Sequence, residues 1–361
     1  MQQRTLLSAT VIFLRFLQLA VSGGNVITVD GDRFQLNGQP YDMWGIRVAS
    51  ASQSQDLTDK LIANLDDYKS CSVNTVAVFV QGSSGGFSDP FSRNGKSIDA
   101  RHLARIKQII EACDDRRMVA IIGIFYQRTM ANYNNTRKLA SSNAVVEAVK
   151  TITRALRDHE NIIINIANEQ NSAKYDQVRG GASRIYDFRD PQKIIDLCRV
   201  VRSEDADRLV GGGGYHDENN IVIGRSADVD ALLFDSLGPD KDHQSGRHYG
   251  HYLANGVRGK PMVNVEMFGG WTARFADSNG EGGYYPQSGK LTHYKEVDDA
   301  ATRPGLSVFF HSNAWCQGPS DGQPVRYDLG GDGTSTSPGI RWYFEYVRRT
   351  IENNKPATDS T

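Results

Sequence analysis

The sequence lacks the cysteine pattern of a zinc or redox site. Its four cysteines, Cys71, Cys113, Cys198 and Cys316, lie far apart and form no Cys-X-X-Cys pair. Cys113 and Cys198 fall on the apolar faces of expected helices, which favours buried thiols. A disulfide formed after export is the alternative, and its pairing does not follow from the sequence.

The chain also lacks a concentrated basic face. Lys and Arg number 41, Asp and Glu number 42, and acids and bases are mixed throughout a chain of net charge −1. Nucleic acids and anionic membranes both select clustered positive charge. We therefore expect neither as a partner.

After residue 22 no apolar run approaches the roughly 18 residues that a membrane-spanning helix needs. The first 22 residues differ, because Arg4 precedes the stretch LLSATVIFL and the small residues AVS precede Gly23. We expect an export signal over residues 1–22 and a secreted or periplasmic protein. Arg15 interrupts the apolar run, and a membrane anchor or a misassigned start codon is the alternative.

No Pro- or Ser-rich linker and no internal repeat divides the remainder, so we expect one domain over residues 23–361. Turn signals at Asp30-Gly31 and Asn37-Gly38 predict a β-hairpin over residues 26–38. Short apolar runs then alternate with amphipathic stretches. The runs are MWGIRV, TVAVFV, MVAIIGIFY, NIIINIANE, RLVGGGGY, ALLFDS, PMVNVE and LSVFFHSNAW. Helical periodicity is clearest over residues 57–68, 103–113, 143–156, 191–201 and 337–351.

Eight buried strands that alternate with helices predict a parallel sheet covered by helices. A count of eight favours a closed (β/α)8 TIM barrel of the α/β class, with the N-terminal hairpin covering its bottom. No dinucleotide-type glycine fingerprint follows the first strand, which is evidence against an open doubly wound sheet. The fifth and sixth runs are joined by a short connection, so its helix should be short. Long loops that wall a cleft or a pocket are expected after the third, sixth, seventh and eighth strands.

Two glutamates close apolar strands. NIIINIANEQN ends its apolar run in Asn168 and Glu169, and KPMVNVE ends in Glu266. Functional residues of such barrels gather at the carboxyl ends of the strands, so these carboxylates should face one another across the mouth. Two surface acids at loop starts are the alternative interpretation.

These elements resemble the retaining β-glycoside hydrolases with (β/α)8 barrels, the cellulase-like clan. The resemblance covers about residues 33 to 350 and includes FQLNGQPYDMWGIR, LARIKQIIEACDDRRMVAIIGIF and the Asn-Glu element of NIIINIANEQN. It implies that Glu169 is the acid/base, that Glu266 is the nucleophile, and that Asn168 binds the sugar 2-hydroxyl. Such a reaction needs both carboxyl groups, since one protonates the leaving oxygen while the other attacks the anomeric carbon.

The chain also departs from the clan. The second strand, TVAVFVQ, offers no arginine beneath the nucleophile, and Arg47 on the first strand is the nearest substitute. The sixth strand ends in Asp235 where many cellulase-like members have His, and the third ends in FYQR instead of a His-containing element. We therefore expect weak or no action on plain cellulose.

Four further residues are candidate sugar contacts. Trp315 follows the eighth strand where the clan places an aromatic platform, and Trp271 lies just beyond the seventh. Tyr126 would contribute a hydroxyl, and His216 would contact substrate or orient Glu266. Packing at the barrel rim is the alternative for Trp315 and Tyr126.

The leading hypothesis is a retaining β-glycoside hydrolase that cleaves β-linked oligo- or polysaccharides by double displacement; the alternative is a catalytically inactive glycan-binding barrel. We expect a carbohydrate substrate, no cofactor and no metal, because the histidine pair in HYGHY lacks a third ligand. A barrel enzyme that abstracts a proton from a sugar acid is a third possibility. It would need a metal cluster or a lysine at a strand end, and the strand ends show neither. Sugar, linkage, endo or exo action and oligomeric state do not follow from the sequence.

Overall fold

The computed structural model describes residues 24–83, 86–126, 139–172, 186–236, 244–267, 283–311, 313–317 and 325–354. The expected export signal and Trp271 lie outside these residues. Among the helices that are described, none is long and apolar enough to cross a membrane.

Eight parallel strands close into a barrel in the order β10-β11-β12-β13-β4-β5-β8-β9. This closed barrel confirms the predicted fold class. The strands are β4 (Trp44–Arg47), β5 (Thr75–Phe79), β8 (Val119–Phe125), β9 (Ile162–Ala167), β10 (Val210–Gly212), β11 (Ala231–Asp235), β12 (Met262–Glu266) and β13 (Leu306–Phe310). All eight lie within the apolar runs of the sequence, because strands buried on both faces are continuously apolar.

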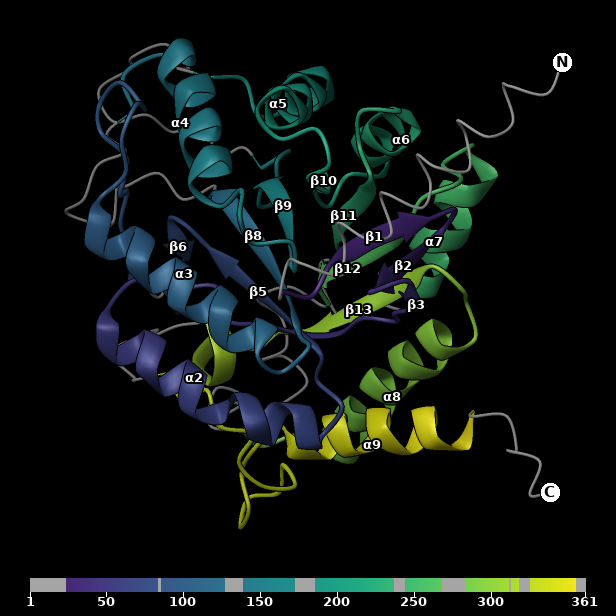
Figure 1. The fold of residues 1–361 in the computed structure, drawn as a ribbon. Helices are drawn as coiled ribbons and strands as arrows, with labels where there is room; N and C mark the ends of the chain where they lie inside the picture. The colour runs from purple at the N-terminus through teal and green to yellow at the C-terminus, as the bar shows by residue number, and fades with distance from the viewer. Residues whose placement is uncertain are drawn as a thin grey trace, which may run out of the picture.

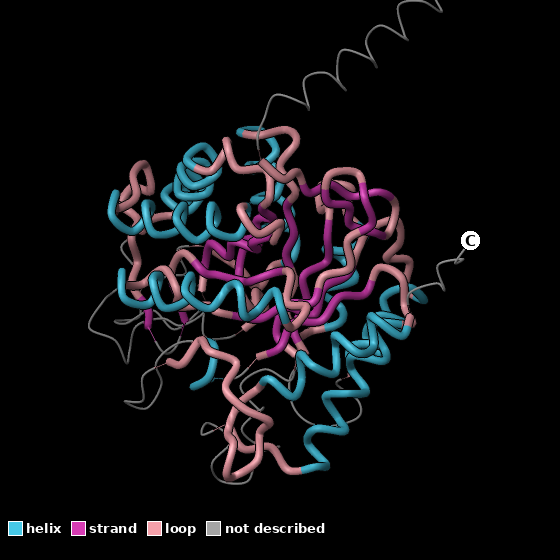
Figure 2. The backbone as a smooth tube through the Cα atoms, turned by 60° about the horizontal axis from the view of Figure 1, so that its bottom comes forward, coloured by secondary structure: helices cyan, strands magenta, loops and turns pink. Residues whose placement is uncertain are grey.

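Helices surround the barrel, as Figure 1 and the tube view in Figure 2 show. They are α2 (Gln55–Ser70), α3 (Ala100–Asp114), α4 (Ser142–Ala155), α5 (Pro191–Glu204), α6 (Asp217–Arg225), α7 (Ser245–Ala254), α8 (Gln287–Ala301) and α9 (Arg341–Asn353). Side chains of Ser54, Asp99, Ser141 and Asp190 accept backbone N–H groups at the starts of α2 to α5. The helix between the fifth and sixth barrel strands, α6, is short as predicted, at 9 residues.

The helices α7 and α8 follow the sixth and seventh barrel strands, and most of the residues between each strand and its helix, 237–243 and 268–282, lie outside the described part, so long loops there stay a prediction. The buried face of α7 consists of Ser245, Gly246, His248, Tyr249 and Tyr252, and α8 buries His293 and Glu296. Polar and small residues on the inward face conceal the apolar periodicity by which a helix is recognised. Beyond the third barrel strand, residues 127–138 lie outside the described part, and so do residues 318–324 after the eighth.

The N-terminal hairpin covers the bottom of the barrel, as predicted. Antiparallel strands β1 (Ile27–Asp30) and β2 (Arg33–Leu36) are extended by a short third strand, β3 (Gln39–Pro40). The N–H of Ile27 donates to the carbonyl of Glu160, just before β9, at 3.0 Å. Ile27, Phe34 and Leu36 join the same apolar cluster as the inward-facing residues of the barrel strands. The barrel strands end at the opposite side, which the hairpin does not cover.

The interior of the barrel is filled by side chains up to its carboxyl end. Phe79 ends β5, and its ring occupies space that a side chain at Gly123 of β8 would fill, since a Cβ there would lie 2.1 Å from the ring. The guanidinium of Arg47 lies over the ring, 4.9 Å from its centroid. Phe79 therefore forms the floor of the site at the barrel mouth.

Candidate active site

Asn168 and Glu169 leave β9 in a tight, buried turn. The N–H of Asn168 donates to the carbonyl of Phe125 at 2.9 Å, and that of Ser172 donates to the carbonyl of Glu169 at 2.8 Å. Glu169 has φ of 42°, a left-handed conformation that is uncommon for a residue with a side chain. Its side chain is largely buried, with the whole residue 8% exposed. Such backbone outliers concentrate at functional sites.

Glu266 reaches the mouth through an irregularity in β12. Val263 and Val265 face the barrel interior, so strict alternation would send Glu266 outward to the helices. The pairing register with β11 shifts at this point, however, from Phe234 opposite Asn264 to Asp235 opposite Glu266. This extra residue in β12 re-aims Glu266, a common use of a β-bulge beside an active site.

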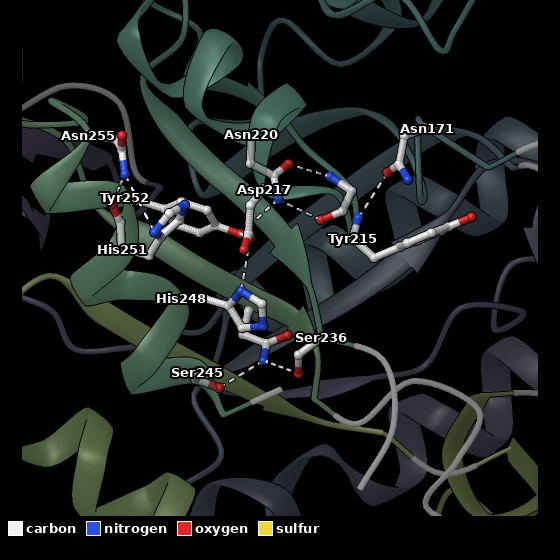
Figure 3. A network of polar contacts seen from close by, with 12 residues as sticks. Asn171, Tyr215, Asp217, Asn220, Ser236, Ser245, His248, His251, Tyr252 and Asn255 are labelled. Atoms are coloured by element: carbon white, nitrogen blue, oxygen red, sulfur yellow. Dashed lines mark hydrogen bonds and ion pairs between the residues drawn. The ribbon is translucent and has the colours of Figure 1, made fainter. Parts of the chain in front are cut away.

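Asn264 holds the bulge by its amide. Its Oδ1 accepts the N–H of Glu266 at 3.2 Å, and its Nδ2 donates to Ser236 Oγ and Ser245 Oγ, both at 2.8 Å. The two serines come from the end of β11 and the start of α7, as Figure 3 shows. Ser245 N–H in turn donates to Glu296 Oε2 at 3.0 Å, and burial raises the pKa of Glu296 to about 7. The backbone of Glu266 is therefore tied to the helix layer.

Arg47 lies directly beside Glu266. It ends β4, is fully buried, and its Nη1 forms an ion pair with Glu266 Oε2. The same Nη1 is 4.0 Å from Asp235 Oδ1. A guanidinium in contact with a carboxylate favours its ionised form. Arg47 therefore contacts Glu266 directly, and its role as a substitute for the missing strand-two arginine stays a prediction.

Sequence reasoning missed a second neighbour of Glu266. His311 follows β13, is fully buried, and its Nε2 lies 3.7 Å from Glu266 Oε1. The same nitrogen contacts Gln317 Oε1 from the π-helical turn Asn313–Gln317. Its position directly after the eighth apolar run was the available signal, since polar residues at strand ends face the mouth.

A third carboxyl group, Asp235, lies between these residues. It is 2% exposed, and the backbone N–H of Glu169 donates to its carboxyl. Burial raises the pKa of Asp235 to about 8, and the charge of Glu169 adds to the effect while Arg47 opposes it. The sequence had marked Asp235 only as a departure from the clan.

The structure also describes two of the predicted sugar contacts, Tyr126 and His216. Tyr126 is buried with its ring edge against Phe79, at a centroid distance of 6.3 Å. His216 is exposed at the start of α6, with its ring against Tyr215. Tyr215 itself was not predicted: its hydroxyl bonds to Ser172, and burial raises its pKa, with a further contribution from the charge of Glu169.

Trp315 is packed instead of presented at the surface. It is 2% exposed, its Nε1 donates to the carbonyl of Asp328 at 2.5 Å, and Arg326 lies over its ring. A Cβ at Gly283 or Gly330 would come within 2.3–2.5 Å of that ring. These contacts favour the rim-packing alternative, and a sugar platform at Trp315 stays a prediction.

Buried polar atoms without partners concentrate at the mouth. Within the described residues, Arg47 Nε and Nη2, Gln81 Nε2, Asp235 Oδ1 and both amide atoms of Gln170 have no hydrogen-bond partner. Buried polar groups are nearly always paired, so such a concentration is typical of a place where substrate or water binds.

The histidine pair of HYGHY lies on α7, and the described residues contain no group of three or more His, Cys, Asp or Glu side chains that could hold a metal ion. His248 Nδ1 contacts Asp217 Oδ1 at 2.9 Å, and Tyr252 donates to the same oxygen at 2.7 Å, as Figure 3 shows. Burial raises the pKa of Asp217, but these two hydrogen bonds outweigh it and lower the pKa overall. The network joins α6 to α7. Cys113 and Cys198 are buried thiols outside any disulfide, as the sequence favoured.

A family model agrees with this geometry. Residues 34–220, more than half of the chain, match the model described as Cellulase (glycosyl hydrolase family 5). The chain belongs to glycosyl hydrolase family 5. It is therefore a glycoside hydrolase, and the resemblance stated from the sequence is confirmed.

Solved structures with the same fold as this family 5 chain have low sequence identity to it. They include the endo-1,4-β-mannanase from Rhizomucor miehei, with 16% identity, a TM-score of 0.54, and coverage of 79% of this chain and 90% of that one. The β-mannanase from the blue mussel Mytilus edulis has 14% identity, a TM-score of 0.56, and coverage of 90% and 96%. A putative glycoside hydrolase from Bacteroides vulgatus has 14% identity, a TM-score of 0.60, and coverage of 92% and 62%. No curated protein matches the sequence.

Proposed function

We propose that the protein is a retaining β-glycoside hydrolase in which Glu266 is the nucleophile and Glu169 the acid/base. The observation that carries the proposal is the unequal environment of the two glutamates. Glu266 contacts Arg47, whereas Glu169 lies beside the carboxyl of Asp235. When two carboxyl groups lie in environments that push their pKa values apart, one can act as the ionised group and the other as the acid.

The environment of Glu266 suits a nucleophile. The buried charge of Arg47 favours the ionised form of a carboxylate in contact with it, and the bulge held by Asn264 fixes the direction of Glu266. A positioned carboxylate attacks the anomeric carbon and forms a glycosyl-enzyme, from which the sugar is later released by water.

The environment of Glu169 suits an acid. A buried carboxyl group is harder to ionise than an exposed one, and Glu169 is only 8% exposed, so it can hold the proton that the leaving oxygen needs. Once that proton is given up, Glu169 becomes the base that activates water. A binding-only barrel would have no need of this difference, and Asn168 beside Glu169 stays the proposed partner of the 2-hydroxyl.

The substrate that we propose is a β-linked oligo- or polysaccharide. The protein would meet it outside the cytoplasm, because an export signal is expected over residues 1–22. The mannanases of the same fold make β-mannan a first polymer to assay. The sequence departures at the third and sixth barrel strands support low activity on plain cellulose.

Azide rescue tests the assignment. Once a panel of aryl β-glycosides has identified a hydrolysed sugar, Glu266→Ala should abolish turnover, and azide should restore part of it by direct attack. The product should be the α-glycosyl azide, inverted relative to the substrate. Asp217→Asn, a carboxyl replacement in the α6–α7 network, is the matched control and should keep parental turnover.

Glu169→Ala should behave differently. Activated aryl glycosides need little protonation, so their first step should survive, and azide should intercept the glycosyl-enzyme to give the β-azide. The same azide anomer from both variants, or near-normal turnover in both, contradicts the proposed roles.

A further inference from the structure

Asp235 brings a third carboxyl group to the barrel mouth. It ends β11 and follows Ala231 and Leu233 on the face that points into the barrel. Its side chain is 1% exposed. Asp235 therefore lies between Arg47, which also contacts Glu266, and Glu169, whose backbone N–H donates to it.

Arg47 lies closer to Glu266 than to Asp235. Its Nη1 is in direct contact with Glu266, whereas Asp235 Oδ1 lies 4.0 Å away, beyond hydrogen-bond distance. Within the described residues Asp235 Oδ1 has no hydrogen-bond partner. A buried carboxylate without a direct ion-pair partner is costlier than the uncharged acid.

The groups around Asp235 add little positive charge. Those that face it or act on it electrostatically are Arg47 from β4, Glu169 after β9, Tyr215 after β10, Glu266 from β12 and Tyr252 from α7. Arg47 alone among them is a cation. Burial and the charge of Glu169 outweigh it, which is why the pKa of Asp235 lies at about 8.

We propose that Asp235 is a positioning residue that acts as an uncharged acid, holding the backbone of Glu169 and leaving the charge of Arg47 to Glu266. The inference rests on the proposed function of the two glutamates. The role of Asp235 in holding Glu169 follows from the backbone N–H of Glu169, which donates to the Asp235 carboxyl. This hydrogen bond supports the left-handed turn at Glu169, where φ is 42°. A catalytic group displaced by about 1 Å can lose 100-fold in rate.

The second part concerns charge. An ionised Asp235 would compete with Glu266 for Arg47 and would place a negative charge beside Glu169, which weakens Glu169 as a proton donor. The active free enzyme should therefore carry protons on both Glu169 and Asp235.

The pH dependence of kcat/KM tests this from about pH 6 to 10. For an aryl β-glycoside with a poor leaving group, Glu169 and Asp235 must both keep their protons. The kcat/KM of the parent should therefore fall about 100-fold per pH unit at the alkaline end. Asp235→Asn should lose only about tenfold per pH unit, because one titrating group is gone. With a dinitrophenyl leaving group, which needs no protonation, the parent should lose about tenfold per unit and Asp235→Asn should show no alkaline loss.

A second comparison separates an uncharged role from an ionic one. At pH 6, Asp235→Ala should lower kcat/KM about 100-fold, and Asp235→Asn should lie at least about tenfold above it, since an amide oxygen still accepts the Glu169 N–H. Asp217→Asn is the matched control and should keep the parental alkaline profile. Should Asp235→Ala fail to fold, the profiles of the parent and Asp235→Asn decide alone.

Two results would overturn the inference: an unchanged two-proton profile in Asp235→Asn, or an Asp235→Asn variant no faster than Asp235→Ala. Failure of the proposed function looks different. If Glu169 is not the acid, the parent should show the same alkaline loss with both leaving groups.

Discussion

Replacing Asp235 by Asn should make the protein more stable at alkaline pH and leave its stability at acidic pH nearly unchanged. The pKa of Asp235 is raised from 3.8 to about 8, chiefly by burial. The folded state therefore holds a proton that the unfolded state releases between these pH values. The stability associated with protonated Asp235 is complete below pH 3.8 and is lost as the pH rises toward 8.

The magnitude follows from the shift. Each pH unit between the two pKa values lowers the free energy of unfolding by about 1.4 kcal/mol, so the interval from pH 5 to 8 is worth about 4 kcal/mol. Because Asp235 is only 2% exposed, solvent screening reduces this little. Asparagine cannot ionise, so the variant should lack this loss.

Urea unfolding of the parent and of Asp235→Asn at pH 5, 6, 7 and 8 measures the effect. The stability of the variant relative to that of the parent should rise by about 4 kcal/mol between pH 5 and pH 8, which corresponds to roughly 5–10 °C in Tm. Contributions of other titrating groups cancel in the difference. A difference that stays constant from pH 5 to 8 would refute an uncharged, buried Asp235.

Arg47→Lys should lower kcat/KM roughly 100-fold with most of the loss in kcat, because the shorter ammonium side chain cannot contact the proposed nucleophile and also lie flat over Phe79; a change confined to KM would contradict this role. Asn264→Ala should lower kcat roughly tenfold or more and cost about 1–3 kcal/mol in unfolding free energy, since two buried serine hydroxyls and a backbone N–H lose their partner. Gly123→Ala should cost about 1–3 kcal/mol and reduce kcat, because the new Cβ displaces Phe79 from beneath Arg47. Gly250→Ala in α7, with nothing within 4 Å of its Cβ, is the matched control and should stabilise by about 0.5–1 kcal/mol. Release of reducing sugar from plain cellulose should be weak or absent beside the best β-linked substrate of the panel, and rates typical of dedicated cellulases would contradict the interpretation of the third and sixth strands.

The barrel could be predicted because its determinants are local. Strands buried on both faces are apolar throughout, and eight such runs separated by amphipathic stretches have few alternative arrangements. The positions of Glu169 and Glu266 followed in the same way, since the carboxyl ends of parallel strands meet at one end of the barrel.

The detailed surroundings of the two glutamates could not be predicted, because they depend on register and contact. No residue pattern marks the bulge that turns Glu266 toward the mouth, and alternation alone would have directed it outward. Similarly, the uncharged state that we propose for Asp235 depends on its 4.0 Å separation from Arg47 and on the burial of its side chain. In α7 the inward face is too polar for its periodicity to indicate a helix.

Covalent trapping tests the central claim most directly. A 2-deoxy-2-fluoro β-glycoside of the preferred sugar, with a dinitrophenyl leaving group, should form a glycosyl-enzyme that accumulates because the fluorine slows its hydrolysis. Peptide mapping by mass spectrometry should find the sugar on Glu266 and nowhere else. A label on Glu169 or Asp235, or turnover without any covalent intermediate and with inversion at the anomeric carbon, would contradict the assignment of Glu266 as the nucleophile of a retaining enzyme.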